Sequence, residues 1–103
     1  MSKTTPATFT AKVPTEKASR YMQQLCKHWA HKMEVDFDAE RGTVNFPTAR
    51  LDMVAGHDEL SLTLAPTGGE DIARLKTVVE DHLNRFAFRE GELAYDWQEQ
   101  VEG

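Results

Sequence analysis

The spacing of apolar residues changes along this chain, and that change constrains the fold more than any other feature. Apolar and polar side chains alternate at the start, where Phe9, Ala11 and Val13 mark a half-buried strand. From Glu16 to about Lys32 apolar residues instead recur at the helical spacing, which predicts an amphipathic helix. The sequence therefore predicts a fold that combines strands with helices.

The middle of the chain returns to alternation and predicts four further strands. Turns at residues 38–42 and 56–58 each contain a glycine, which is typical of tight connections between antiparallel strands. Thr15 is the expected N-cap of the preceding helix. The four strands are marked by the apolar residues Val35 and Phe37, Val44 and Phe46, Leu51 and Met53, and Leu60, Leu62 and Leu64.

A second helix is expected from about residue 70, because Thr67-Gly68-Gly69-Glu70 matches a capping box. After this helix, Leu93 to Trp97 alternates again and predicts a last strand. The inner face of the second helix is expected to carry Ile72, Leu75, Val79, Leu83 and Phe86.

The predicted order of elements is β-α-β-β-β-β-α-β. Strands with alternating polarity bury only one face, so both helices should cover that face and leave the other in water. We therefore predict an α+β fold, a two-layer α/β sandwich with a mostly antiparallel sheet and two helices on one face. The 103 residues are expected to form a single domain, residues 1–103, with an ordered core of about 7–98.

Composition argues against several classes of function. A formal net charge of -5 is unfavourable for binding nucleic acid, which requires clustered cations. No apolar run approaches the roughly 18 to 20 residues of a membrane span, and no export signal precedes the first strand. The single cysteine, Cys26, cannot form an internal disulfide. We therefore expect a cytoplasmic protein that has neither a nucleic-acid partner nor a membrane partner.

Basic side chains share one outward arc of the predicted first helix, although the whole chain is acidic. Such a stripe could hold a small anionic molecule. The alternatives are an ordinary solvated face, or a dimer contact with the acidic C-terminal segment of a second copy. The stripe consists of Lys17, Arg20, Lys27, His28 and His31.

His82 lies at the edge of the buried stripe of the second helix, between Leu75 and Phe86 by helical angle. A buried imidazole without a partner costs about 1–3 kcal/mol, so His82 should form a hydrogen bond or turn towards a pocket. If His82 met His28 between the helices, the two could form a pH-sensitive or ligand-binding pair. A packed histidine with a satisfied hydrogen bond is the alternative.

Neither a metal site nor a cofactor site is expected. Cys26 and His28 point about 200° apart around a helix, so they cannot share an ion. His28 and His31 together supply only two ligands, fewer than a structural or catalytic zinc site uses. Cys26 lies near the apolar stripe and is expected to be an inert packed thiol. Glycine motifs that bind phosphates or dinucleotides are missing, and these features favour a protein without catalytic activity.

Two segments resemble a bacterial family, domain of unknown function 2218. They are Arg20-Tyr21 with residues 25–32, and residues 82–90 followed by Trp97, and the resemblance spans about residues 7–98. Members of that family occur alone or joined to siderophore-interacting, flavin-dependent ferric reductases. The resemblance therefore implies a role near iron or siderophore handling, but no redox activity, because the flavin reductase portion has no counterpart in this sequence.

Three hypotheses of function follow from these observations. The first is a non-catalytic accessory or binding protein for a small anionic ligand or an iron chelate. The second is a protein-interaction module that docks on a reductase partner or forms a homodimer. The third is a small hydrolase or isomerase that uses His82 or His28. The candidate ligand-binding residues of the first hypothesis are Lys27, His28, His31, His82 and Arg85.

Overall fold

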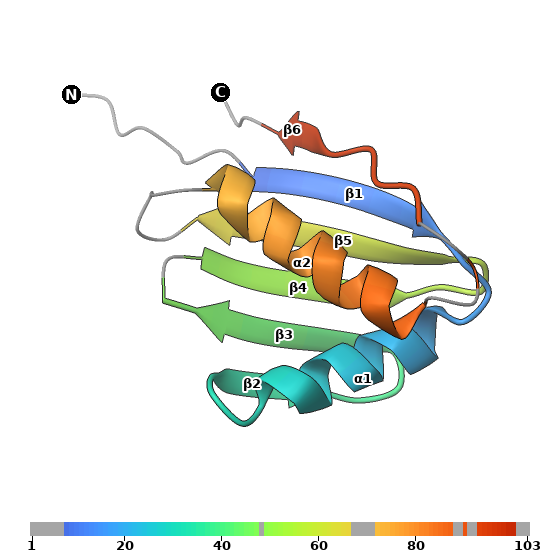
Figure 1. Cartoon of the computed structure of the whole chain (residues 1–103), viewed down its shortest axis with the longest axis horizontal. Helices are drawn as coiled ribbons and strands as arrows, with labels where there is room; N and C mark the ends of the chain where they lie inside the picture. Colours follow the sequence, from blue (N-terminus) through green and yellow to red (C-terminus); the bar gives the residue numbers. More distant parts are fainter. Residues whose placement is uncertain (1–7, 48, 67–71, 88–89, 91–92, 101–103) are drawn as a thin grey trace.

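The computed structural model describes residues 8–47, 49–66, 72–87, 90 and 93–100 (Figure 1). Its elements follow the predicted order, and the predicted α+β fold class is confirmed. The elements are β1 (Thr8–Pro14), α1 (Ala18–Trp29), β2 (Glu34–Phe37), β3 (Arg41–Phe46), β4 (Ala49–Ala55), β5 (Glu59–Pro66), α2 (Ile72–Phe86) and β6 (Gln98–Gln100).

The strands form one sheet in the order β2-β3-β4-β5-β1-β6, and each neighbouring pair is antiparallel. Strands β2 to β5 are consecutive neighbours, as hairpin connections dictate. The first strand joins them from the far side, where Val13 of β1 lies opposite Leu60 of β5. Strand β6 then pairs with the outer edge of β1. The sheet is therefore open, with β2 and β6 as its two edge strands.

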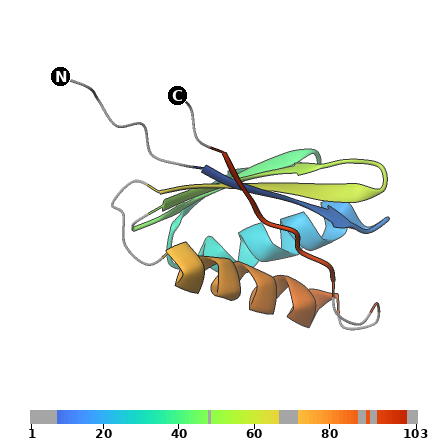
Figure 2. The same ribbon diagram turned by 90° about the horizontal axis from the view of Figure 1, so that it is seen from above.

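Both helices lie on the same face of the sheet (Figure 2). That face consists of alternate strand residues, and Val44, Leu51 and Leu64 are fully buried there. The opposite face carries the polar residues that alternate with these apolar ones. Thr43 of β3 and Asp52 of β4, for example, lie opposite each other there, and the Thr43 hydroxyl donates a 2.8 Å hydrogen bond to Asp52. The predicted two layers and the predicted wet face are therefore present.

Each helix contributes one apolar stripe to the core between the layers. Met22 and Leu25 of α1 are fully buried, as are Val79 and Leu83 of α2. Among the described residues, neither helix has the length and hydropathy of a membrane span. The predicted capping box at 67–70 lies outside the described residues.

The ends of α1 differ from the prediction. The helix begins at Ala18, so the Thr15 hydroxyl is not at the N-cap; instead it accepts a 3.1 Å hydrogen bond from the Lys17 N–H. The helix ends at Trp29, and His31 and Lys32 lie in the turn that follows. The helical spacing of apolar residues predicted a later end. The turn after the helix still has helix-like hydrogen bonds, because the N–H groups of Lys32 and Met33 both donate to the Trp29 carbonyl.

Gly42 lies within β3, although the sequence suggested that it belonged to the hairpin turn. The turn is closed by Asp38, whose carboxylate accepts hydrogen bonds from the N–H groups of Glu40 and Arg41 at 2.7 and 3.0 Å. A Cβ at Gly42 would lie only 2.7 Å from the Sγ of Cys26. Close approach of α1 to the sheet therefore explains this glycine.

The predicted strand at Leu93 to Trp97 is wrong, because the last strand begins at Gln98. The segment instead rises from the helix layer to the sheet edge (Figure 2). The Leu93 N–H donates a hydrogen bond to Asn84 at 3.1 Å, and the Trp97 indole donates one to Glu80 at 2.7 Å. The segment is thus bonded to α2 through the Leu93 backbone and the Trp97 side chain, and residues 93–97 do not pair with a strand.

Candidate functional site

The packing of α1 beside α2 brings two histidines into contact. The ring centroids of His28 and His82 are 5.1 Å apart, and the ring planes are inclined by 50°. His28 is exposed at the surface, whereas His82 is half-buried. The pair that the sequence allowed between the two helices is therefore present.

Two aromatic residues of the core, Trp29 and Phe46, connect this histidine pair to the sheet. Trp29 packs edge-on against Phe46 of β3, with ring centroids 4.9 Å apart. The ring of His82 lies 5.0 Å from that of Trp29 and is followed by His28 towards the surface. Because Trp29 is buried in the core, the position of His82 is fixed by contacts that reach the sheet.

The hydrogen bond of His82 determines which ring nitrogen carries the proton. Its Nδ1 lies 2.7 Å from the carbonyl oxygen of Val78, one turn earlier in α2. A carbonyl can only accept, so Nδ1 is the donor and, in the neutral ring, Nε2 keeps its lone pair. His82 is thus a packed histidine with a satisfied Nδ1–H, and no hydrogen bond to its Nε2 is formed by the residues that the structure describes.

Positive charge surrounds the exposed member of the pair. Desolvation by the packing around the ring lowers the pKa of His28 below its ordinary value of 6.5, and nearby groups that carry a positive charge, or gain one on protonation, lower it further. These groups come from both helices and from the turn after α1. They are His82, Lys32, Arg85 and His31.

The structure therefore brings together four of the five predicted ligand residues. His82 contacts the ring of His28, and His31 and Arg85 lie near enough to lower the pKa of His28. Lys27 is exposed one residue before His28, about 100° around the helix, and does not contribute to the pKa of His28. We call His28, His31, Lys32, His82 and Arg85 the basic cluster. Its member Lys32 was not among the predicted ligand residues.

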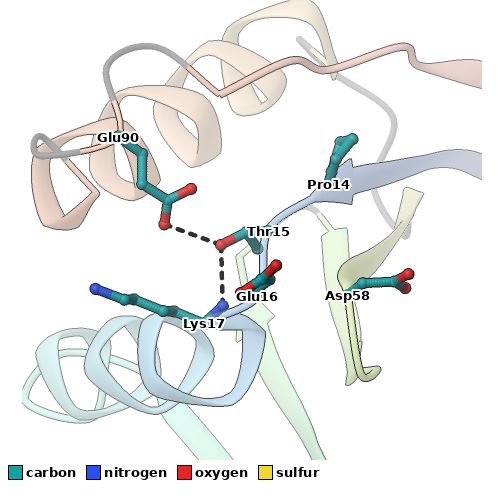
Figure 3. Close-up of a pocket in the computed structure, with 6 residues that line it drawn as sticks. All are labelled: Pro14, Thr15, Glu16, Lys17, Asp58 and Glu90. Carbon is teal, nitrogen blue, oxygen red and sulfur yellow. Dashed lines mark hydrogen bonds between the residues drawn. The ribbon is translucent and has the colours of Figure 1, made fainter.

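A second polar site lies at the start of α1 and was not predicted (Figure 3). The Thr15 hydroxyl donates a 3.0 Å hydrogen bond to Glu90, and the Tyr21 hydroxyl donates to the same carboxylate oxygen. Burial and the bond to Glu90 both raise the pKa of Tyr21. A cavity of about 440 Å³ adjoins this carboxylate. It is lined by Pro14, Thr15, Glu16, Lys17, Asp58 and Glu90.

No sequence signal pointed to this second site, because Thr15 and Tyr21 lie 75 and 69 positions from Glu90. Its hydroxyl groups are already engaged with the carboxylate. Glu90, which follows α2, therefore connects that part of the chain to the start of α1 through these hydrogen bonds.

Cys26 matches the expectation of an inert thiol. It is fully buried, and desolvation raises its pKa to about 11, so the reactive thiolate is disfavoured. Within the described ranges, no three histidine, cysteine or acidic side chains lie close enough to hold a metal ion. The basic cluster can thus offer cations, hydrogen-bond donors and two imidazoles, but not a complete set of metal ligands.

These features define a class of small α+β protein, in which two helices cover one face of an open antiparallel sheet and a histidine pair joins the helices. The chain belongs to the family described as "Uncharacterized protein conserved in bacteria (DUF2218)", whose model matches residues 10–98. The resemblance stated above is therefore confirmed.

A solved structure shares this fold. The chain is similar to the NMR structure of PA4090 from Pseudomonas aeruginosa, with 37% sequence identity and a TM-score of 0.73. The similarity covers 88% of this chain and 94% of that chain. A comparison with curated proteins gives no match.

Proposed function

We propose that this protein is a non-catalytic binding protein that holds a small anionic ligand on the basic cluster between α1 and α2. The observation that carries the proposal is the contact of His28 with His82, surrounded by Arg85, Lys32 and His31, on a chain of net charge -5. The family resemblance suggests iron or siderophore handling as the context, so iron chelates are the first ligands to test.

The chemistry of the cluster suits an anion with several oxygens. An arginine guanidinium binds carboxylate or phosphate through two parallel hydrogen bonds, and Arg85 is exposed on α2. His28 is also exposed, so a ligand can reach both helices at once. Binding to exposed charges is screened by salt, and affinity should therefore fall as ionic strength rises.

Binding is favoured over catalysis by the contacts of the two rings. Acid–base catalysis by histidine usually depends on a neighbouring nucleophile or an orienting carboxylate. In the described part of the chain, His82 instead bonds a backbone carbonyl, and the ring contacts of both histidines are to aromatic residues or to each other. A hydrolase or isomerase using His82 or His28 has less support from this arrangement.

The proposal predicts that a bound anion perturbs the cluster selectively. Titration with citrate, ferric citrate and pyrophosphate, followed by NMR, should give saturable shifts at His28, His82 and Arg85. Arg85→Gln should weaken binding of any responding anion by about tenfold, equivalent to about 1.4 kcal/mol. A bound ligand should also raise the melting temperature of the native protein.

Arg50→Gln is the matched control, because Arg50 is an exposed arginine on the opposite face of the sheet, paired with Asp52 at 3.1 Å. It removes the same charge without touching the cluster, so affinity should stay within about twofold of the original. Equal losses in the two variants, or no saturable shift with any of the three anions at millimolar concentration, would refute the proposal. Binding only to a reductase or to a second copy would instead support the interaction hypothesis.

A further inference from the structure

We infer that His28 and His82 jointly coordinate a transition-metal ion that arrives already held by an anionic chelator. In this arrangement the protein supplies two imidazole nitrogens, and the chelator supplies the remaining ligands. The inference rests on the proposed function, because it assigns a chemical class to the ligand of the same basic cluster.

The spacing of the two rings is the first argument. A metal–nitrogen bond of about 2.0–2.1 Å places the centre of an imidazole ring about 3.2 Å from the ion. Two imidazoles on one ion therefore have ring centres about 4.5 Å apart at a right angle, and about 5.2 Å apart at the tetrahedral angle. The observed separation of 5.1 Å between His28 and His82 falls within this range.

The second argument is the orientation of His82. Histidines that bind metals commonly donate their other ring N–H to a backbone carbonyl or a carboxylate, which fixes the tautomer and the ring direction. His82 makes this bond through Nδ1 to the Val78 carbonyl at 2.7 Å. In the neutral ring the lone pair is then on Nε2, the nitrogen that would bind the ion. Packing against Trp29 holds the ring in place.

The third argument decides between a bare ion and a chelated one. Two protein ligands are too few for a closed site, and no third histidine, cysteine or acidic side chain joins them among the described residues. Arg85 and Lys32 near His28 would also repel a free dication. An anionic complex with two open coordination positions avoids both problems, because it completes the ligand set and is attracted by the cations.

The two imidazole ligands limit which metals the site can bind. Imidazole nitrogen suits zinc, copper, nickel and iron, whereas magnesium and calcium prefer oxygen ligands. The expected partner is therefore a partly coordinated, negatively charged complex of one of these transition metals.

Nickel nitrilotriacetate is a suitable probe, since the chelator occupies four positions, leaves two adjacent ones open and gives the complex a negative charge. Titration of the whole chain should show one complex per protein by calorimetry. Paramagnetic broadening of NMR signals should be centred on His28 and His82. His28→Gln and His82→Gln should each weaken binding by at least about tenfold.

His57→Gln is the matched control, because His57 is an exposed histidine in the turn between β4 and β5. It should leave the affinity unchanged. Should half-buried His82 prove necessary for folding, exposed His28 still decides the question. Full binding to His28→Gln, or an equal loss in His57→Gln, would overturn the inference.

The anion proposal and the metal inference fail in different ways. Saturable binding of citrate to the cluster, without coordination of nickel nitrilotriacetate, would overturn the metal inference and leave the anion site standing. Coordination by the two histidines that Arg85→Gln does not weaken, with no binding of citrate or pyrophosphate, would overturn the anion site instead.

Discussion

Replacing Trp29 with alanine is expected to lower the free energy of unfolding by about 3–5 kcal/mol, the usual cost of removing a large buried aromatic side chain. Trp29 is buried and joins three parts of the structure, because its ring packs on Phe46 of β3, on His82 of α2 and beside His28. Such a loss is a large share of the roughly 5–15 kcal/mol that stabilises an ordinary domain. Chemical denaturation with two independent probes measures it.

Trp97→Ala is the control for this loss. Like Trp29, Trp97 contacts α2, in its case through the hydrogen bond to Glu80. It is only partly buried, and it lies in the segment that runs from the helix layer to the sheet edge. Its replacement should cost roughly half as much or less, since less apolar surface is exposed by the change. Similar losses for Trp29 and Trp97 would show that the stack from β3 to the histidine pair does not hold the layers together.

Gly42→Ala is expected to destabilise the protein by about 1–3 kcal/mol, as overpacking of a tight core does. The new Cβ would lie 2.7 Å from the Cys26 Sγ and 3.3 Å from the Phe37 Cβ. Cys26 is fully buried, so its sulfur cannot move into solvent. Cys26→Ala removes that sulfur, and in the double variant the cost of Gly42→Ala should fall by about 1–2 kcal/mol.

Gly56→Ala provides the control for this double-mutant cycle. Gly56 lies in the turn after β4, and a Cβ there would meet Glu59 and not Cys26. Its effect should therefore add to that of Cys26→Ala without coupling. If Gly42→Ala and Cys26→Ala were equally additive, the close approach of α1 to β3 would not be the reason for this glycine.

Alternation and helical spacing predicted most of the fold because both patterns report directly which face of an element is buried. They misplaced the last strand because Leu93, Tyr95 and Trp97, at every second position, contact α2. An extended segment packed on a helix has the same alternation of apolar residues as a strand with one buried face. They also misjudged Gly42, since a glycine under a helix and a glycine in a turn look alike in a sequence.

The histidine pair was only partly predictable. Helical angles showed that His82 lies at the edge of the buried face of its helix and that His28 points outward, but they carry no information on how far one helix slides along another. Contact between the two rings depends on that offset, which Trp29 and Phe46 set through the core. The bonds of Glu90 to Thr15 and Tyr21 were beyond any local pattern.

The most direct test of the basic cluster is a pH titration of the imidazole signals of His28 by NMR, in the absence of added ligand. We expect a midpoint below 6.5, because desolvation disfavours protonation of His28, and so does the positive charge that Lys32 and Arg85 carry and that His82 and His31 gain on protonation. Arg85→Gln should move that midpoint back towards 6.5, and Arg50→Gln should not. A midpoint at or above 6.5 that neither variant changes would mean that these cations do not gather around His28.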